Sequence, residues 1–512
     1  MPEEQFNAQI EVPAREKADR GAFETPGYTL EETAIADVES VQTGWVAGEW
    51  PRFGERTLAA MRSVFFGAMS ACLLLSVAFY NGYPTVYPDT GGYLYTGAFG
   101  IPLFPFRSPG YGAFAMLTSW RVSSWFTVGA QAILVVVVLY ESCKYLIGGD
   151  SRFRDHCLLA IAAFLAAFSS LPWETSLLMP DVFAGVVFLS LFLLAFNARM
   201  NWVERIGLAA ISAIGVGGHV SLLPIASLFV AALLIARGRS WAPRGALSTK
   251  SVLPWLIVPL LAAGIWNANL NRQLGLGFKL SPSGNDFLLG RLLNDGLAAD
   301  FLRENCPQSP FVACRYVDNL PKTPEQFLFW HPMLREMDAS GNEVKEIVRG
   351  TLAAYPLRFA WNSAKHTLRQ LVQFKTGDEV RDLALHAPNS NGLVIAMVFP
   401  RDIGAYAGSK LIQGGLIRLT KIVARVDTGV FWLSALGCGI VAFSRRDQKW
   451  NSFFCSALIF LFLNAAVCAS LAGVYDRYQA RVAWLVPLCL ATYVCRRLSE
   501  ARRDSALRGD FQ

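Results

Sequence analysis

The sequence contains ten long runs of apolar residues, most of them separated by short loops. A helix needs about 20 apolar residues to cross the hydrocarbon core of a bilayer, and only a helix or a closed barrel satisfies its backbone amides there. The apolar residues cluster in runs and do not alternate as in a strand. The pattern predicts an all-α polytopic membrane protein with about ten transmembrane helices, over residues 57–80, 125–147, 157–171, 180–197, 204–219, 221–236, 252–271, 428–444, 452–473 and 482–495.

Composition and charge agree with a membrane protein. Of the 512 residues, 53% are hydrophobic and only 17% are charged, whereas a soluble domain carries about a quarter charged residues. The net charge of +7 comes from Lys and Arg in the short loops between apolar runs. Because that distribution follows the positive-inside rule, it argues against a nucleic-acid partner.

The loops also predict an orientation. The loops at 171–180 and around 219 carry no Lys or Arg, whereas the loops on the opposite side do. We therefore expect both termini in the cytoplasm and an integral plasma (inner) membrane location. The predicted parts are a disordered tail (1–50), a seven-span module (51–271), an extracytoplasmic, mostly helical segment (272–427), a three-span module (428–497) and a basic tail (498–512).

Two cysteines stand apart from the other eight, which lie in or beside apolar runs and act there as small hydrophobic residues. Cys306 and Cys314 lie in the predicted extracytoplasmic segment, with a Pro-rich turn between them. In an oxidising compartment such a pair forms a disulfide, and two unpaired thiols are the alternative. Farther along the segment, 343–371 has helical spacing that Pro356 is expected to interrupt.

The first predicted extracytoplasmic loop carries one acid, Asp89, among several tyrosines that include Tyr93. A single carboxylate among aromatic side chains at a membrane surface suits a general base. The tyrosines suit contact with a sugar or a lipid, and they also suit ordinary anchoring at the interface. The alternative for Asp89 is a cap on the following helix.

Further polar residues lie in the other loops on the same predicted side. Glu174 and Asp181 could bind a cation or assist the base, although Asp181 follows a proline and could simply begin a helix. His219 at membrane depth needs a partner, which either a ligand or its own turn could supply. Arg477 and Arg481 contradict the positive-inside trend and call for an anion, either a lipid phosphate or an acidic side chain such as Asp476.

Several signatures of other enzyme classes are missing from the sequence. It contains no P-loop, no Gly-x-Ser-x-Gly elbow, no His-Glu-x-x-His and no dinucleotide fingerprint. Their absence argues against ATP-driven transport and against serine or zinc proteolysis. No Cys-x-x-Cys pair is present either, which argues against a structural zinc site.

The layout resembles that of the GT-C superfamily of membrane glycosyltransferases, which take sugars from polyprenyl-phosphate carriers. The similarity rests on the first loop, YPDTGGYLY, with its acid Asp89; on Glu174, Asp181 and His219 in the following loops; and on a large segment before the last spans, which end in DRYQARVAWLVP. It covers most of 57–495. Many members carry two neighbouring acids in the first loop, whereas this chain carries one, so the metal requirement stays open and a divalent cation remains a possible cofactor.

The resemblance implies a function in the synthesis of cell-envelope glycans or glycolipids. Asp89 would accept the proton of an acceptor hydroxyl, and attack on the sugar would invert its anomeric centre. Arg477, Arg481 or Arg107 would stabilise the leaving phosphate. The implied partners are the bilayer, a polyprenyl-phosphate sugar donor and a glycan, lipid or protein acceptor. The alternatives are an oligosaccharide polymerase or ligase, a transporter or flippase of lipid-linked sugars, and a non-catalytic assembly factor.

Overall fold

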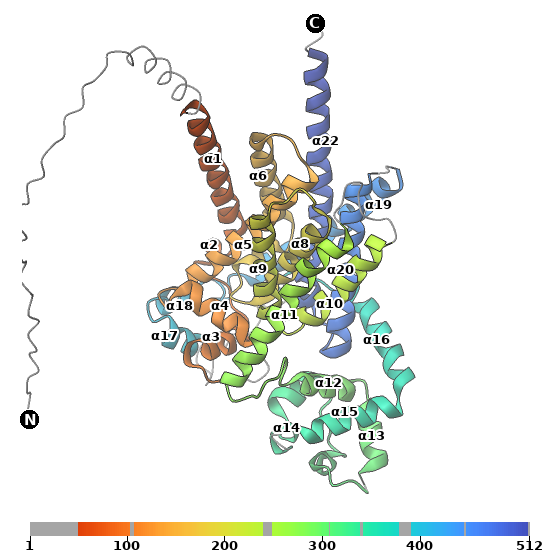
Figure 1. Ribbon diagram of the computed structural model, residues 1–512. Helices are drawn as coiled ribbons and strands as arrows, with labels where there is room; N and C mark the ends of the chain where they lie inside the picture. The colour runs from red at the N-terminus through yellow and green to blue at the C-terminus, as the bar shows by residue number, and fades with distance from the viewer. Residues whose placement is uncertain are drawn as a thin grey trace, which may run out of the picture. The chain divides into compact units, whose positions relative to one another are not determined.

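A computed structural model describes residues 50–102, 107–238, 248–306, 308–337, 341–377, 391–444 and 447–509 (Figure 1). The chain divides into two compact units, Met1–Leu58 and Ala59–Gln512. Of the first unit the structure describes only the beginning of helix α1, so the predicted tail lies almost entirely outside the described residues. All contacts given below lie within the second unit.

Among the described residues, six helical stretches are long and apolar enough to cross a membrane. They are Thr57–Leu74 in α1 (Trp50–Leu74), α5 (Ser124–Leu146), α11 (Thr249–Gln273), α19 (Ile417–Ser444), α20 (Gln448–Leu471) and Asp476–Ser505, which joins α21 (Asp476–Ala483) to α22 (Leu485–Gly509). A bilayer is therefore an expected partner of this chain. In the part of the chain that the structure describes, the fold is all-helical apart from one isolated β-bridge.

The predicted count of about ten spans is not confirmed. Four of the predicted ranges fall on α6 (Ser151–Phe168), α8 (Phe183–Phe196), α9 (Trp202–Gly218) and α10 (Leu222–Gly238), which have 18, 14, 17 and 17 residues. At 1.5 Å per residue these helices are shorter than the roughly 30 Å hydrocarbon core. The first predicted span is also interrupted, because α1 ends at Leu74 and α2 (Ser76–Asn81) follows.

The main hydrophobic core is centred on α8. All 14 residues of this helix are buried, which explains why its sequence is apolar on every side. The ring of Phe188 lies 5.5 Å from that of Phe229 on α10, and 5.8 and 5.3 Å from those of Phe453 and Phe460 on α20. The core therefore joins the N-terminal and C-terminal groups of apolar helices.

Short helices occupy two of the segments that connect the apolar helices. The first loop contains α3 (Thr90–Phe99) and α4 (Pro109–Ser119), and the next contains α7 (Leu171–Ser176) and the 3₁₀ turn η1 (Pro180–Val182). The two loops pair directly: Thr85 donates to the carbonyl of Ser176 (2.9 Å) and accepts from the amide of Leu178 (2.9 Å). The first two of these loops are therefore direct neighbours in the fold.

Residues 284–371 form a helical region with a hydrophobic core of its own. It contains α12 (Gly284–Asn294), α13 (Leu297–Asn305), η2 (Val312–Tyr316), the π-helical turn η3 (Gln326–Trp330), α14 (Met333–Glu336), α15 (Asn342–Ala354) and α16 (Pro356–Leu371). The expected interruption at Pro356 is confirmed, since α15 ends at Ala354. After this region come α17 (Asn391–Val398) and α18 (Ile403–Ala407). The core includes Leu289, Leu302, Phe327 and Ile347.

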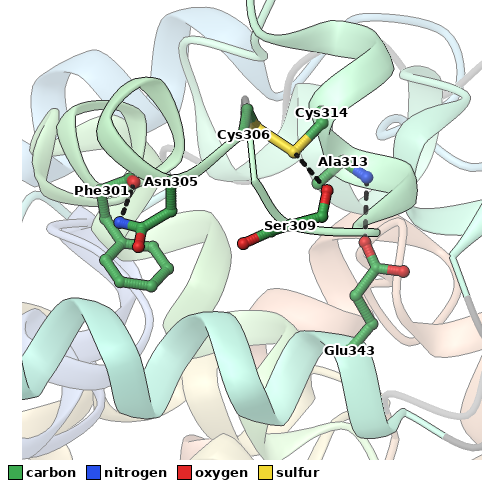
Figure 2. Close-up of a disulfide and its surroundings, with 7 residues drawn as sticks. All are labelled: Phe301, Asn305, Cys306, Ser309, Ala313, Cys314 and Glu343. Carbon is green, nitrogen blue, oxygen red and sulfur yellow. Dashed lines mark hydrogen bonds between the residues drawn. A yellow bond between two sulfur atoms is a disulfide. The ribbon is translucent and has the colours of Figure 1, made fainter.

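The structure contains a disulfide between Cys306 and Cys314, as Figure 2 shows. It closes the turn between α13 and η2. Beside it, the amide of Ala313 donates to the carboxylate of Glu343 on α15 (2.9 Å). Together these two links fasten the turn to the helices of the region.

Candidate functional site

Asp89 immediately precedes α3, but its side chain does not cap that helix. The carboxylate instead accepts hydrogen bonds from two guanidinium groups: Arg107 contacts Oδ1, and Nη2 of Arg477 lies 3.1 Å from Oδ2. Arg107 comes from the end of the loop between α3 and α4, and Arg477 comes from α21. The first loop and α21, which are far apart in the sequence, therefore meet at one carboxylate, which is only 12% exposed.

The backbone around Asp89 is held by Asn391 at the start of α17. The Asn391 side chain accepts from the amide of Gly91 (2.7 Å) and donates to the carbonyl of Tyr87 (2.8 Å). A Cβ on Gly91 would lie 2.9 Å from the Asn391 oxygen, so the glycine permits this close approach. One side-chain amide thus holds the backbone two residues before and two residues after Asp89.

The ion-pair cluster carries more positive than negative charge. Two guanidinium groups face one carboxylate, and Nη1 of Arg477 and Nε of Arg107 are buried without a hydrogen-bond acceptor among the described residues. The guanidinium of Arg477 also lies over the ring of Tyr87, 4.2 Å from its centroid. Buried donors of this kind are costly unless a ligand accepts from them. The cluster is therefore suited to bind an anion.

His219 ends α9 beside this cluster. Its Nδ1 accepts from the amide of Ser221 (3.2 Å) and lies 2.9 Å from the Ser221 hydroxyl. Burial lowers the pKa of His219 well below its usual range, and Arg481, Arg477 and Arg107 lower it further. A neutral ring whose Nδ1 accepts a hydrogen bond carries its proton on Nε2. His219 both stabilises its own turn and lines a cavity.

A close contact between α4 and α9 brings Arg107 and His219 together. The carbonyl of Gly217 accepts from the hydroxyl of Ser108 (2.6 Å) and from the side-chain amide of Asn267 on α11 (2.9 Å). A Cβ on Gly110 would lie 2.2 Å from that carbonyl oxygen, so the position requires glycine. Arg107 and His219 each lie within three residues of this contact.

Arg481 does not line the cavities described below. It is fully buried, its Nη2 donates to Asn464 (2.8 Å) and Ser221 (3.0 Å), and its Nη1 lies 3.7 Å from the carboxylate of Asp181. The expected phosphate contact therefore does not fit its surroundings. Arg481 positions His219 through Ser221. The acidic partner that the sequence predicted for Arg481 is an internal side chain, that of Asp181.

The remaining candidates differ in their surroundings. Tyr93 is buried beside Arg107 and lines the large cavity, and burial raises its pKa above the usual range, so the phenol stays protonated. Glu174 on α7 is buried and lines neither of the cavities that adjoin the cluster. Asp476 accepts from the amide of Lys375 (2.7 Å).

Within the described ranges, no group of three or more His, Cys, Asp or Glu side chains could hold a metal ion.

Two cavities adjoin the ion-pair cluster. The large cavity, of about 430 Å³, has mostly apolar walls and a polar end formed by Tyr93, Arg107, His219 and Arg477. It shares Leu223, Ser227 and Leu280 with an apolar groove of about 470 Å³ between α10 and α11. The small cavity, of about 90 Å³, is lined by Asp89, Arg107 and Arg477 and by residues of the 284–371 region. Asp89 lines the small cavity but not the large one.

Sequence reasoning missed Ser221, Asn267, Asn391 and Glu325, all of which support or line these cavities. Asn267 could have been noticed as a polar residue inside an apolar run. Glu325 and Asn391 lie in polar stretches, where nothing in the sequence distinguishes them from solvated residues. Their roles depend on contacts between distant segments.

We compared the chain with models of known protein families, with curated proteins and with solved structures. None of the three comparisons found a match.

Proposed function

We propose that this chain is a glycosyltransferase of the GT-C type, which transfers a sugar from a polyprenyl phosphate to an acceptor hydroxyl at the extracytoplasmic face of the plasma membrane. One observation carries the proposal: two arginines that line both a large, mostly apolar cavity and a small, more polar one hold a carboxylate that lines the small cavity. The two cavities suit two substrates of different polarity.

The large cavity suits the lipid-linked donor. Its apolar walls and the adjoining groove would hold the polyprenyl chain, and the unpaired donors of Arg107 and Arg477 would contact the phosphate. Charge-assisted hydrogen bonds from guanidinium groups are among the strongest that a phosphate accepts. The neutral His219, with its proton on Nε2, adds an uncharged donor at the same end.

The chemistry follows from where charge develops. As the bond between sugar C1 and the phosphate oxygen breaks, its electron pair leaves with the phosphate, whose charge Arg107 and Arg477 neutralise. The acceptor oxygen bonds to C1 from the opposite face, which inverts the anomeric centre, and its proton passes to Asp89. Bound phosphate would draw the guanidinium groups away from Asp89, leaving the carboxylate ready to accept the proton.

The test uses purified protein in nanodiscs with a panel of undecaprenyl-phosphate-linked hexoses and pentoses and a mixture of candidate acceptors. We expect mass spectrometry to detect released undecaprenyl phosphate together with a glycosylated acceptor for at least one donor. A transporter or flippase would bind or move the donor and leave its C1–O bond intact. Donor binding without cleavage, under conditions that include envelope glycans as acceptors, would contradict the proposal.

A further inference from the structure

The small cavity lies on the side of the ion-pair cluster that Asp89 faces. One part of its wall comes from the loops at the end of the apolar helices, with Tyr87, Asp89 and Tyr475. The other comes from the 284–371 region, with Glu325 just before η3 and Phe329 within it. The arginines line both cavities, whereas the carboxylate lines only this one. A proton that reaches Asp89 therefore comes most directly from a molecule in the small cavity.

Glu325 lines the small cavity and is held there by Tyr475. The Tyr475 hydroxyl donates to Oε1 of Glu325, and Oε2 makes no hydrogen bond to any of the described residues. Tyr475 is itself fixed at its backbone, where its amide donates to Gln370 (2.9 Å) and its carbonyl accepts from the same side chain (2.8 Å). The free oxygen can accept a hydrogen bond from a ligand hydroxyl.

The lining of the small cavity indicates the class of ligand. Carboxylates and phenols bind hydroxyl groups, and aromatic rings such as those of Phe329 and Tyr478 offer flat apolar faces. Its volume of about 90 Å³ corresponds to roughly six to nine water positions, enough for the hydroxyl-bearing edge of one ring. Its two carboxylates are matched by the guanidinium groups of Arg107 and Arg477, so the lining as a whole favours an uncharged ligand over an ion.

We propose that the small cavity is the acceptor site and that it takes an uncharged, hydroxyl-rich acceptor, a sugar ring, held by Glu325 while one of its hydroxyls faces Asp89. This inference rests on the proposed glycosyl transfer. It assigns the 284–371 region a direct part in substrate binding, because that region supplies Glu325 and Phe329.

The experiment uses the full-length protein with Glu325→Gln, Tyr475→Phe and the control Glu336→Gln, an exposed acid of the same region paired with Arg315. The probes are methyl hexosides and methyl pentosides as acceptors, and undecaprenyl phosphate as the donor mimic. Binding of each probe is measured separately, together with the acceptor KM where turnover is detected. A melting curve for each variant establishes that it is folded.

We expect Glu325→Gln to weaken binding of the preferred methyl glycoside by about ten- to a hundredfold, because a charge-assisted hydrogen bond is lost. Tyr475→Phe should weaken it less, and undecaprenyl phosphate should bind all variants alike. Unchanged glycoside binding in folded Glu325→Gln and Tyr475→Phe would overturn the acceptor site while leaving the proposed transfer standing. Failure of the wild-type protein to bind undecaprenyl phosphate would instead contradict the proposed function.

Discussion

Arg477 and Arg481 lie four residues apart on α21, yet their guanidinium groups meet different partners. Arg477 contacts Asp89 and lines both cavities, whereas Arg481 is enclosed by Asn464, Ser221 and Asp181. One side chain is therefore available to a ligand, and the other is part of the interior. Substitution of the two residues should separate binding from stability.

We predict that Arg477→Ala lowers the affinity for undecaprenyl phosphate by about ten- to a hundredfold, the effect of losing one charge-assisted contact. Arg481→Ala should instead destabilise the fold by about 3–5 kcal/mol, because it leaves Asp181 as an unpaired buried charge. Lipid binding and thermal unfolding of both variants provide the comparison. A folded Arg481→Ala protein with wild-type stability would show that the buried ion pair is dispensable.

His219 predicts a pH dependence of stability. Burial and three arginines lower the pKa of His219 in the folded protein. In the unfolded chain a histidine has a pKa of about 6.5. Below that pH the unfolded chain binds a proton that the folded chain excludes, so stability falls as pH falls, by up to about 1.4 kcal/mol per pH unit from this group. His219→Gln should flatten the dependence of the melting temperature between pH 7 and pH 5.

The exposed His156 on α6 provides the matched control. His156→Gln should leave the pH dependence of the melting temperature as it is in the wild-type protein. If His219→Gln and His156→Gln behave alike, His219 exchanges protons freely in the folded state and its assigned neutral form is wrong.

At the candidate site, the sequence identified residues but not their partners. Asp89 stands out in the sequence as the one acid among several tyrosines. Arg477 and Arg481 stand out because positive charge in a predicted extracytoplasmic loop contradicts the positive-inside rule. Nothing in the sequence indicated that Asp89 pairs with Arg477, which lies 388 positions away. The spacing of Arg477 and Arg481 could not separate their roles either, since the burial of Arg481 depends on Asn464 of α20, on Asp181 of η1 and on Ser221.

At the scale of the helices, the contact between α4 and α9 can be tested with one methyl group. The Cβ of Gly110→Ala would meet the backbone of Gly217 at 2.2 Å, so the two helices must separate. We expect a loss of stability of about 1–3 kcal/mol, the usual cost of overpacking, and weaker binding of undecaprenyl phosphate as Arg107 shifts.

Gly207→Ala on α9 is the control, because a Cβ there has no neighbour within 4 Å. It should be neutral or stabilising by roughly 0.5–1 kcal/mol, since alanine favours a helix interior. Equal melting temperatures for Gly110→Ala and the wild-type protein would show that the two helices separate without cost, and that this contact does not fix Arg107.

Apolar periodicity located most of the long helices but could not establish how many of them cross the membrane. Each of the ten predicted ranges contains a helix, yet within the described part of the chain six stretches have the length and hydropathy of a span. A continuous apolar run such as that of α8 is produced equally by burial inside a bundle and by contact with lipid. Hydropathy cannot distinguish these two environments.

For the whole molecule, the proposed orientation is testable by labelling from one side. Introduced cysteines at the exposed Arg303 on α13 and the exposed Ser505 on α22 should differ in their reaction with an impermeant maleimide on intact cells. The positive-inside rule predicts labelling at 303 and protection at 505 until the cells are permeabilised. The reverse pattern would place the Asp89 site in the cytoplasm and remove the case for an extracytoplasmic enzyme.

The account depends most on Asp89, and Asp89→Asn tests it most directly. Asparagine keeps the size of the side chain but cannot accept a proton, so we predict that the transfer rate falls by about 10²–10⁴-fold. Binding of undecaprenyl phosphate should persist, because Arg107 and Arg477 remain and lose their competing carboxylate. Asp300→Asn, at an exposed acid paired with Arg358, should retain wild-type activity. A folded Asp89→Asn protein that transfers sugar at the wild-type rate would contradict the catalytic role of Asp89.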